Sequence, residues 1–293
     1  MDINIGFAIN DSYAQHCACA IASVLANADQ EDKYSFWIVY DFLTEENKTK
    51  IKKLKKIKDF DINFIKINKE DFSLISKNTQ TNPSHFFKLK FFNLKEINKI
   101  LYLDSDVIVR KDIGALYETD MVDSYMAAVK DIGCKTVKKR LNLSKSSIYI
   151  NSGVMLIDLE KTREIDISQK IDDFLYIYSK NNYGDQDVIN YIFQEKIKEL
   201  DIRYNCMFPY HNEYDDWNYY VQVSQDPVII HYIATGKPWA AGVQCHLRSD
   251  YFKYLRLTPY YDEFIDLYRI EENSKIFSML SEIKSMLKGE KTD

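Results

Sequence analysis

I-L-Y-L-D-S-D-V-I-V, residues 100–109, joins an apolar strand to two closely spaced carboxylates, and it is the stretch that most strongly indicates the fold. The strand expected at residues 99–103 runs straight into Asp104, Ser105 and Asp106, after which the apolar pattern resumes. Two acids cannot cheaply be buried together without a cation, because like charges repel and desolvation adds to the cost. A hard divalent ion, Mg²⁺ or Mn²⁺, resolves this through oxygen ligands. The alternative is a solvated turn, and the apolar strand directly before the acids argues against it.

Upstream of this stretch, strand and helix patterns alternate. Short apolar runs at residues 3–9, 34–40 and 60–67 predict buried strands, and an Ala-rich segment at residues 13–26 predicts a helix. Thr44 is expected to cap a second helix, with acids in the first turn and lysines toward the end, as the helix dipole favours. Strand–helix–strand–helix–strand predicts parallel pairing, and ligands of such sheets bind outside the carboxyl ends of the strands.

Further strands and helices are expected after residue 84. The strands lie at residues 125–129, 148–157 and 228–233, and the helices at residues 85–94, 168–179 and 185–194. No internal repeat or clear linker interrupts them. The length of 293 residues therefore predicts one large α/β domain, or one domain with a small appendage.

Bulk composition narrows the classes of function. The formal charge of −5 gives no electrostatic reason to expect nucleic acid as a partner, for which a basic face is typical. Five scattered cysteines without a C-x-x-C pair are expected to be reduced thiols of a cytoplasmic protein. The N-terminus shows no signal-peptide pattern, and no apolar run approaches the roughly 20 residues that a bilayer-spanning helix needs.

The C-terminal segment carries apolar residues at helical spacing between Ile276 and Leu287, with lysines nearby. Two interpretations are open. The helix packs on the domain, which we favour, or it lies on an anionic membrane surface and gives the protein a peripheral contact with the inner face of the membrane.

A second stretch that carries chemistry is P-V-I-I-H-Y-I-A-T-G-K-P-W, residues 227–239. His231 stands at the end of an expected strand, where a histidine with satisfied hydrogen bonds in the core is the alternative to a metal ligand. Gly236 allows close backbone approach to a phosphate, and Lys237 supplies a cation. An imidazole added to two carboxylates suits Mn²⁺ somewhat better than Mg²⁺.

A third stretch, Y-G-D-Q-D at residues 183–187, opens an expected helix. Asp185 and Asp187 both suit the start of a helix, as a cap or as first-turn acids. Asp185 and Gln186 could instead hydrogen-bond sugar hydroxyls, because both end in compact planar polar groups.

Taken together, five motifs resemble glycosyltransferase family 8, especially the bacterial lipopolysaccharide α-galactosyl- and α-glucosyltransferases. In order, they are F-A-I-N-D-S-Y (7–13), L-Y-L-D-S-D (101–106), N-S-G-V-M-L-I-D (151–158), G-D-Q-D (184–187) and H-Y-I-A-T-G-K-P-W (231–239). The resemblance implies a GT-A fold over residues 1–250, a Rossmann-like and mostly parallel sheet flanked by helices, followed by a small helical appendage at residues 251–293. It also implies retaining, Mn²⁺-dependent transfer of galactose or glucose from a UDP-hexose donor to a saccharide acceptor of a bacterial surface glycan. The new linkage would be α, and Mg²⁺ is the alternative cofactor.

Residue roles carry over from the family position by position. The resemblance implies Asp104, Asp106 and His231 as metal ligands. It implies Ala8, Asn10 and Tyr13 at the uracil and ribose, and Asn151, Asp185 and Gln186 at the transferred sugar. Lys237, with backbone near Ala234 and Gly236, would contact the diphosphate, and Lys88 and Ser105 would also bind the donor. Gln186 would support positive charge at the anomeric carbon, Asp185 is the alternative as a nucleophile, and Asp131 would border the acceptor.

Two positions depart from the family pattern. Lys88 stands where the family usually has Arg beside the donor, so the charge stays but the two-pronged hydrogen bonding is lost. Asn10 stands where the first motif often has Asp, which removes one negative charge near the nucleotide.

Other interpretations stay open from the sequence alone. A Mg²⁺-dependent phosphatase or phosphotransferase would use Asp104 as its nucleophile, but it explains neither His231 nor Lys237. A non-catalytic nucleotide-sugar binding protein is the other alternative. The ring-rich region at residues 204–220, with Trp217, is either an acceptor loop or a loop tucked onto the core.

Overall fold

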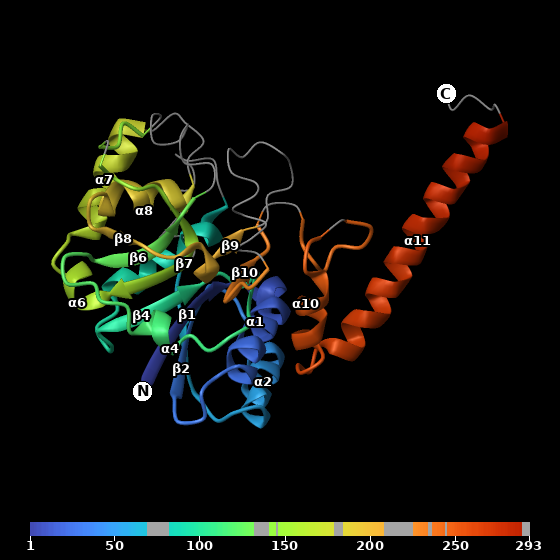
Figure 1. Cartoon of the computed structure of the whole chain (residues 1–293), viewed down its shortest axis with the longest axis horizontal. Helices are drawn as coiled ribbons and strands as arrows, with labels where there is room; N and C mark the ends of the chain where they lie inside the picture. The colour runs from blue at the N-terminus through green and yellow to red at the C-terminus, as the bar shows by residue number, and fades with distance from the viewer. Residues whose placement is uncertain are drawn as a thin grey trace.

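The protein is described here by a computed structural model that covers residues 1–68, 82–131, 141–144, 146–178, 184–207, 225–233, 236–243 and 245–288. Its centre is a seven-stranded sheet flanked by helices, with the strand order β3-β2-β1-β4-β7-β6-β8 (Figure 1). The strands are β1 (Asp2–Ile9), β2 (Lys33–Tyr40), β3 (Asp61–Lys66), β4 (Lys99–Leu103), β6 (Met126–Lys130), β7 (Ile150–Asp158) and β8 (Ile197–Glu199).

Strand β7 interrupts an otherwise parallel sheet. It runs antiparallel to β4 and to β6, whereas the β3–β2, β2–β1, β1–β4 and β6–β8 pairs are parallel. The prediction of a mostly parallel sheet is confirmed. The reversal at β7 and the short strand β8 were not predicted.

A second, three-stranded sheet consists of β5 (Val107–Val109), β10 (Ile229–His231) and β9 (Cys206–Met207). Strand β10 pairs antiparallel with β5, and His231 lies opposite Val107. The backbone N–H of Tyr232 also donates to the carbonyl of Asp106 at 3.0 Å. This small sheet therefore brings His231 beside Asp106, although 125 positions of sequence separate them.

Helices cover both faces of the central sheet (Figure 1). They are α1 (Ala14–Ala26), α2 (Glu45–Lys52), α4 (Gly114–Tyr117), α6 (Leu159–Thr162), α7 (Ile167–Tyr178), α8 (Asp185–Phe193), α10 (Arg248–Leu255) and α11 (Tyr261–Lys288), with 3-10 turns at η1 (Asp11–Tyr13), η2 (Lys53–Lys56), η4 (Pro83–Asn93) and η5 (Ile202–Tyr204). One apolar core lies between the sheet and α1, and a second packs the aromatic residues of η4 with α7 and α8. The segment expected as a helix at residues 85–94 is thus a 3-10 helix, with the side chain of Asn82 as its cap.

The chain ends in two helices of different environment. Helix α10 packs on α1 through Tyr251 and Tyr254, both buried. Helix α11 leaves α10 and runs outward from the domain (Figure 1), with Leu267, Ile270 and Met279 exposed. None of the helices in the described ranges has the length and hydropathy needed to cross a membrane.

The cysteines that the structure describes are free, as expected. Cys17, Cys19 and Cys206 are buried and Cys245 is partly exposed. Cys134 lies outside the described residues.

Candidate active site

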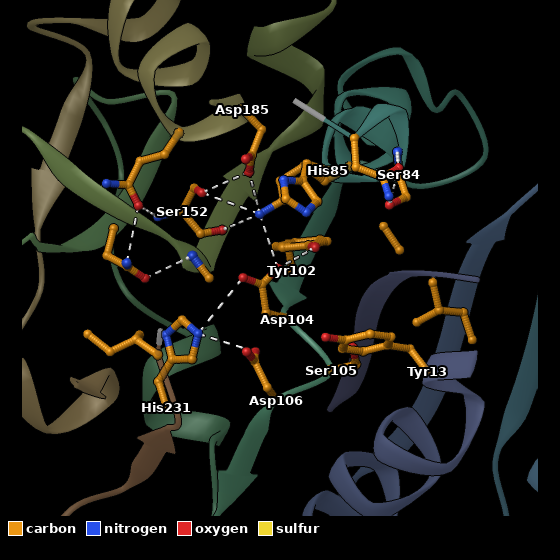
Figure 2. A pocket seen from close by; sticks show the side chains of 18 of the residues that line it. Tyr13, Ser84, His85, Tyr102, Asp104, Ser105, Asp106, Ser152, Asp185 and His231 are labelled. Carbon is orange, nitrogen blue, oxygen red and sulfur yellow. Dashed lines mark hydrogen bonds and ion pairs between the residues drawn. The ribbon is translucent and has the colours of Figure 1, made fainter. Parts of the chain in front are cut away.

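A cavity of about 500 Å³ opens at the carboxyl ends of β1 and β4, where a parallel sheet places its ligands (Figure 2). It gathers residues from all five sequence motifs. The lining residues are Ala8, Ile9, Asn10, Tyr13, Asn82, Ser84, His85, Lys88, Tyr102, Asp104, Ser105, Asp106, Asn151, Ser152, Gly153, Asp185, Gln186, His231, Ile233 and Lys237.

Two carboxylates and one imidazole meet on one wall of the cavity. One ligand atom from each of Asp104, Asp106 and His231 lies within 4.8 Å of the other two. Nε2 of His231 is 3.3 Å from Oδ1 of Asp106 and 3.9 Å from Oδ2 of Asp104 (Figure 2). The ring is 3% exposed, so its position is fixed by packing.

Gly153 makes room for this cluster. A Cβ at this position would lie 2.2 Å from Cε1 of His231 and 2.9 Å from Oδ2 of Asp104, which is closer than real Cβ contacts allow. The carbonyl of Gly153 also accepts the backbone N–H of Asp104 at 2.7 Å. Strand β7 can approach the histidine and the acids only because this residue has no side chain.

Two lysines balance the acids. Nζ of Lys88 lies 3.1 Å from Oδ1 of Asp104 and 2.8 Å from Oδ2 of Asp185, and Nζ of Lys237 lies 2.5 Å from Oδ2 of Asp106. Burial alone lowers the pKa of Lys88, but the two carboxylates outweigh it and hold that pKa well above its usual value. The Tyr102 hydroxyl donates to Oδ1 of Asp104 at 2.6 Å and fixes that carboxylate further.

The Asp106 carboxyl stays ionised in this setting. Burial raises its pKa, but the charge and hydrogen bond of His231, together with those of Lys237, outweigh burial and hold the pKa well below its ordinary value. An ionised carboxylate is the form that binds a metal ion.

Beyond the acid–histidine cluster, the cavity is lined by a network of amide side chains. Oε1 of Gln186 accepts from the backbone N–H of Ser152 and from Nδ2 of Asn151, both at 3.1 Å. Nε2 of Gln186 donates to Oδ2 of Asp131 at 3.1 Å. Asp185 accepts from the Ser152 hydroxyl at 3.2 Å, so these side chains have defined orientations.

A third part of the cavity is lined by the first motif, residues 7–13. Oδ1 of Asn10 accepts from the backbone N–H of Tyr13 at 3.3 Å and caps η1. The ring of Tyr13 is 39% exposed at the cavity and meets His16 and Trp239 edge-on. His16 and Trp239 stack with their ring centroids 3.6 Å apart, and the hydroxyl of Tyr251 lies 2.8 Å from Nδ1 of His16.

His16 is neutral because of burial, which lowers its pKa to about 3. The His16–Trp239 stack holds the loop of Lys237 against α1. Lys237 therefore reaches the cavity from a fixed position.

A family model, Glycosyl transferase family 8, matches residues 4–242. The chain belongs to this family. It is therefore a glycosyltransferase.

Curated relatives and solved structures are similar to this chain over most of its length. General stress protein A of Bacillus subtilis is 24% identical over 263 residues, which cover 86% of this chain and 92% of that protein. A lipopolysaccharide 1,2-glucosyltransferase of Escherichia coli is 28% identical over 261 residues, covering 85% of this chain and 76% of the other. The galactosyltransferase LgtC, solved with donor and acceptor sugar analogues, superposes with a TM-score of 0.75 at 26% identity, covering 88% of this chain and 96% of that one. The predicted GT-A fold is thereby confirmed, and the phosphatase alternative is not favoured.

The glycosyltransferase brings most of the predicted site residues into the one cavity. Asp131 does not line it but bonds to two residues that do, and Gly236 lies beside Lys237 without lining it. Ala234 lies outside the described residues, as do Trp217 and the rest of residues 208–224, so the acceptor-loop prediction stays a prediction.

Several residues of the site were not singled out from the sequence. Gly153 and Tyr102 lie inside quoted motifs, but their roles depend on which side chains the fold places against them. Ser84 and His85 line the cavity from η4 (Figure 2), and their sequence context carried no signal of it.

The side chains of Asp104, Asp106 and His231 are suitable ligands for a divalent cation. Two carboxylates and an imidazole are ligands that Mn²⁺ accepts, and a cation would offset the repulsion between the two partly buried acids. Gly153 also lets strand β7 lie close to His231 and Asp104, so that these ligands can meet at one point.

Proposed function

We propose that this glycosyltransferase moves a hexose from a UDP-hexose donor to a saccharide acceptor with retention of configuration, forming an α-linkage. The observation that carries this proposal is the order of groups along one cavity. Contacts give that order. Exposed Tyr13 meets Trp239 of the Lys237 loop, and Lys237 pairs with Asp106 of the acid–histidine cluster. Lys88 and Asp185 then connect Asp104 of that cluster to Ser152, whose backbone N–H donates to Gln186. A nucleoside, a diphosphate and a sugar follow one another in the same order in the donor.

Asp104, Asp106 and His231 would hold the cation, Mn²⁺ or Mg²⁺. When bound, the cation supplies Lewis-acid stabilisation of negative charge on the diphosphate and orients it. Lys237 would add a positive charge at the same group, because its ammonium already lies beside Asp106.

Binding of the donor would use the chain's own polar groups. Tyr13 would stack on the uracil, with Ala8 and the capping residue Asn10 beside the ribose. Ser105, buried between the two acids, and the backbone near Gly236 would line the diphosphate. Lys88, held between Asp104 and Asp185, would place its charge between the metal ligands and the sugar.

Retention through a covalent intermediate needs a free nucleophile close to the anomeric carbon. Asp185 is engaged by Lys88 and by the Ser152 hydroxyl, and the oxygen of Gln186 already accepts two hydrogen bonds. Both observations support same-face substitution. The bond from the anomeric carbon to UDP breaks as the acceptor oxygen bonds to that carbon on the same face, and the acceptor proton passes to the departing phosphate oxygen. Gln186 would support the positive charge at the anomeric carbon.

The acceptor would be a saccharide of a bacterial surface glycan, bound near Asp131. The curated relative from Escherichia coli is a lipopolysaccharide glucosyltransferase and LgtC is a galactosyltransferase, which supports glucose or galactose as the transferred sugar. Residues 1–250 would carry catalysis in the cytoplasm. The helical segment at residues 251–293 would bring the enzyme to the membrane through the exposed apolar residues of α11.

The test is UDP release from a panel of UDP-sugars with Mn²⁺, with Mg²⁺ and with EDTA. Release from one UDP-hexose that EDTA abolishes is the expected result, and it names the donor. Binding of UDP-sugars without release or transfer to any acceptor would instead indicate a nucleotide-sugar binding protein. A mass-spectrometric adduct of the sugar on Asp185 would overturn same-face substitution.

A further inference from the structure

A buried asparagine outside the quoted motifs, Asn205, lies between the acid–histidine cluster and the sugar end of the cavity. It ends η5 directly before β9, and it is 0% exposed. Its Oδ1 lies 3.0 Å from Nδ1 of His231, and its Nδ2 donates to Oδ1 of Asn151 at 2.9 Å. Both ends of its amide are therefore engaged.

The backbone dictates which way this amide faces. The N–H of Gly153 donates to Oδ1 of Asn151 at 3.0 Å, so an oxygen must occupy that end of Asn151. That oxygen needs a donor from Asn205, which places Nδ2 of Asn205 there and turns its Oδ1 toward His231. Because an amide oxygen only accepts hydrogen bonds, Nδ1 of His231 must carry a proton.

The proton on Nδ1 decides what the other ring nitrogen can do. A proton on Nδ1 leaves Nε2 as the ring nitrogen whose lone pair a cation can use. In this structure Nε2 faces Asp106 and Asp104 (Figure 2). By engaging Nδ1–H, Asn205 therefore leaves Nε2 as the nitrogen that can bind a cation in the cluster.

The same hydrogen-bond chain continues to the sugar end. Nδ2 of Asn151 donates to Oε1 of Gln186, whose orientation is fixed in turn by the backbone N–H of Ser152. His231, Asn205, Asn151 and Gln186 thus form one directed chain of hydrogen bonds.

We propose that Asn205 is a positioning residue of the transferase reaction. It holds His231 in the tautomer with hydrogen on Nδ1 and keeps the ring in a fixed relation to the amides that face the sugar. This inference rests on the proposed metal site, in which Nε2 of His231 is a ligand. Groups that orient a metal-bound histidine in this way typically change metal affinity about 10–100-fold when removed.

The first experiment measures the tautomer itself. Nitrogen-15 spectra of the imidazoles are recorded on the metal-free protein, and His231 is assigned among the five histidines with a His231→Gln variant. We expect a protonated Nδ1 for His231. A proton found on Nε2 with a bare Nδ1 would overturn the proposal.

Two variants separate the two ends of the amide. Asn205→Leu keeps a similar size but removes both hydrogen bonds. We therefore expect His231 to lose its preference for a proton on Nδ1 and Mn²⁺ to bind roughly tenfold more weakly. Mn²⁺ binding is measured from the electron paramagnetic resonance signal of free Mn²⁺. Asn205→Asp keeps an acceptor for His231 but sets a second oxygen against Oδ1 of Asn151. That variant should retain the tautomer and Mn²⁺ binding and lose kcat.

The outcomes separate this inference from the proposed function. Unchanged Mn²⁺ binding and an unchanged tautomer in folded Asn205→Leu would refute the role of Asn205. If Asn205→Leu does not fold, the wild-type tautomer and the Asn205→Asp variant decide: loss of the Nδ1 proton in Asn205→Asp would contradict the proposal. If added Mn²⁺ leaves the wild-type His231 signals unbroadened, the proposed metal site fails, while the tautomer still tests what Asn205 does.

Discussion

Gly153→Ala adds one methyl group at the point where β7 meets the acid–histidine cluster. Its Cβ would lie 2.2 Å from Cε1 of His231 and 2.9 Å from Oδ2 of Asp104. Ordinary carbon contacts are about 3.5–4.0 Å, so the ring must move by roughly 1 Å or more. Backbone atoms hold the methyl on one side and the small sheet holds His231 on the other, so the movement displaces the proposed ligands.

Two effects of this substitution can be given magnitudes. Overpacking of this kind costs about 1–3 kcal/mol of unfolding free energy. A displacement of roughly 1 Å in a group that positions the reaction costs about 100-fold in rate, which corresponds to about 2.7 kcal/mol. We therefore expect kcat/KM for hexose transfer to fall about 100-fold and Mn²⁺ binding to weaken, in a protein that still unfolds cooperatively.

Matched glycine variants serve as controls. Gly6→Ala also forces a contact, 2.9 Å from Ile100 and the ring of Phe91, but in the apolar core. It should lose stability and keep Mn²⁺ affinity. Gly184→Ala, where an added Cβ meets no atom of the described residues within 4 Å, should change neither by much. Transfer and Mn²⁺ binding in Gly153→Ala at the level of Gly184→Ala would refute the reasoning.

Three further changes test other parts of the site. Asp106→Ala should reduce hexose transfer by at least about 1000-fold with an unchanged circular-dichroism spectrum, because it removes a proposed ligand and no core volume; full activity of this variant in EDTA would contradict the metal assignment. Lys88→Met should lower the free energy of unfolding, measured in urea, by about 2 kcal/mol, because it leaves two partly buried carboxylates without their buried cation. Lys88→Arg should recover most of the loss, and an equal loss in both variants would show that packing, and not charge, is responsible. His16 binds fewer protons folded than unfolded because its pKa is lowered from 6.5 to about 3, so stability is lost as the pH falls below about 6.5. It should contribute about 2 kcal/mol of loss between pH 7 and pH 5, and a His16→Leu variant should show a correspondingly flatter profile in urea unfolding; identical profiles would mean that the pKa of His16 is the same in the folded and the unfolded protein.

Much of the fold was readable because its signals are local. Apolar runs in the first 70 residues gave β1, β2 and β3, and the alternation with α1 and α2 gave their parallel pairing. The antiparallel insertion of β7 and the pairing of β10 with β5 were not predicted. Both depend on contacts between segments far apart in the chain, and a strand's own sequence does not specify its partner.

Some residues of the site could be predicted from the sequence, and others could not. Asp104, Asp106 and His231 were predicted as a group from their residue types and motifs, and the structure brings them together. Gly153, Tyr102 and the 3-10 geometry of η4 could not be read in this way. A glycine or a tyrosine has no chemistry that marks it, and its role follows only from the side chains that the fold sets against it.

The most direct test of the central claim is the anomalous diffraction of crystals grown with Mn²⁺ and UDP. We predict one manganese peak at a coordination distance of about 2 Å from Asp104, Asp106 and His231, with the diphosphate of UDP between that peak and Lys237. A manganese peak elsewhere, or UDP bound in the cavity without any peak at these three side chains, would contradict it.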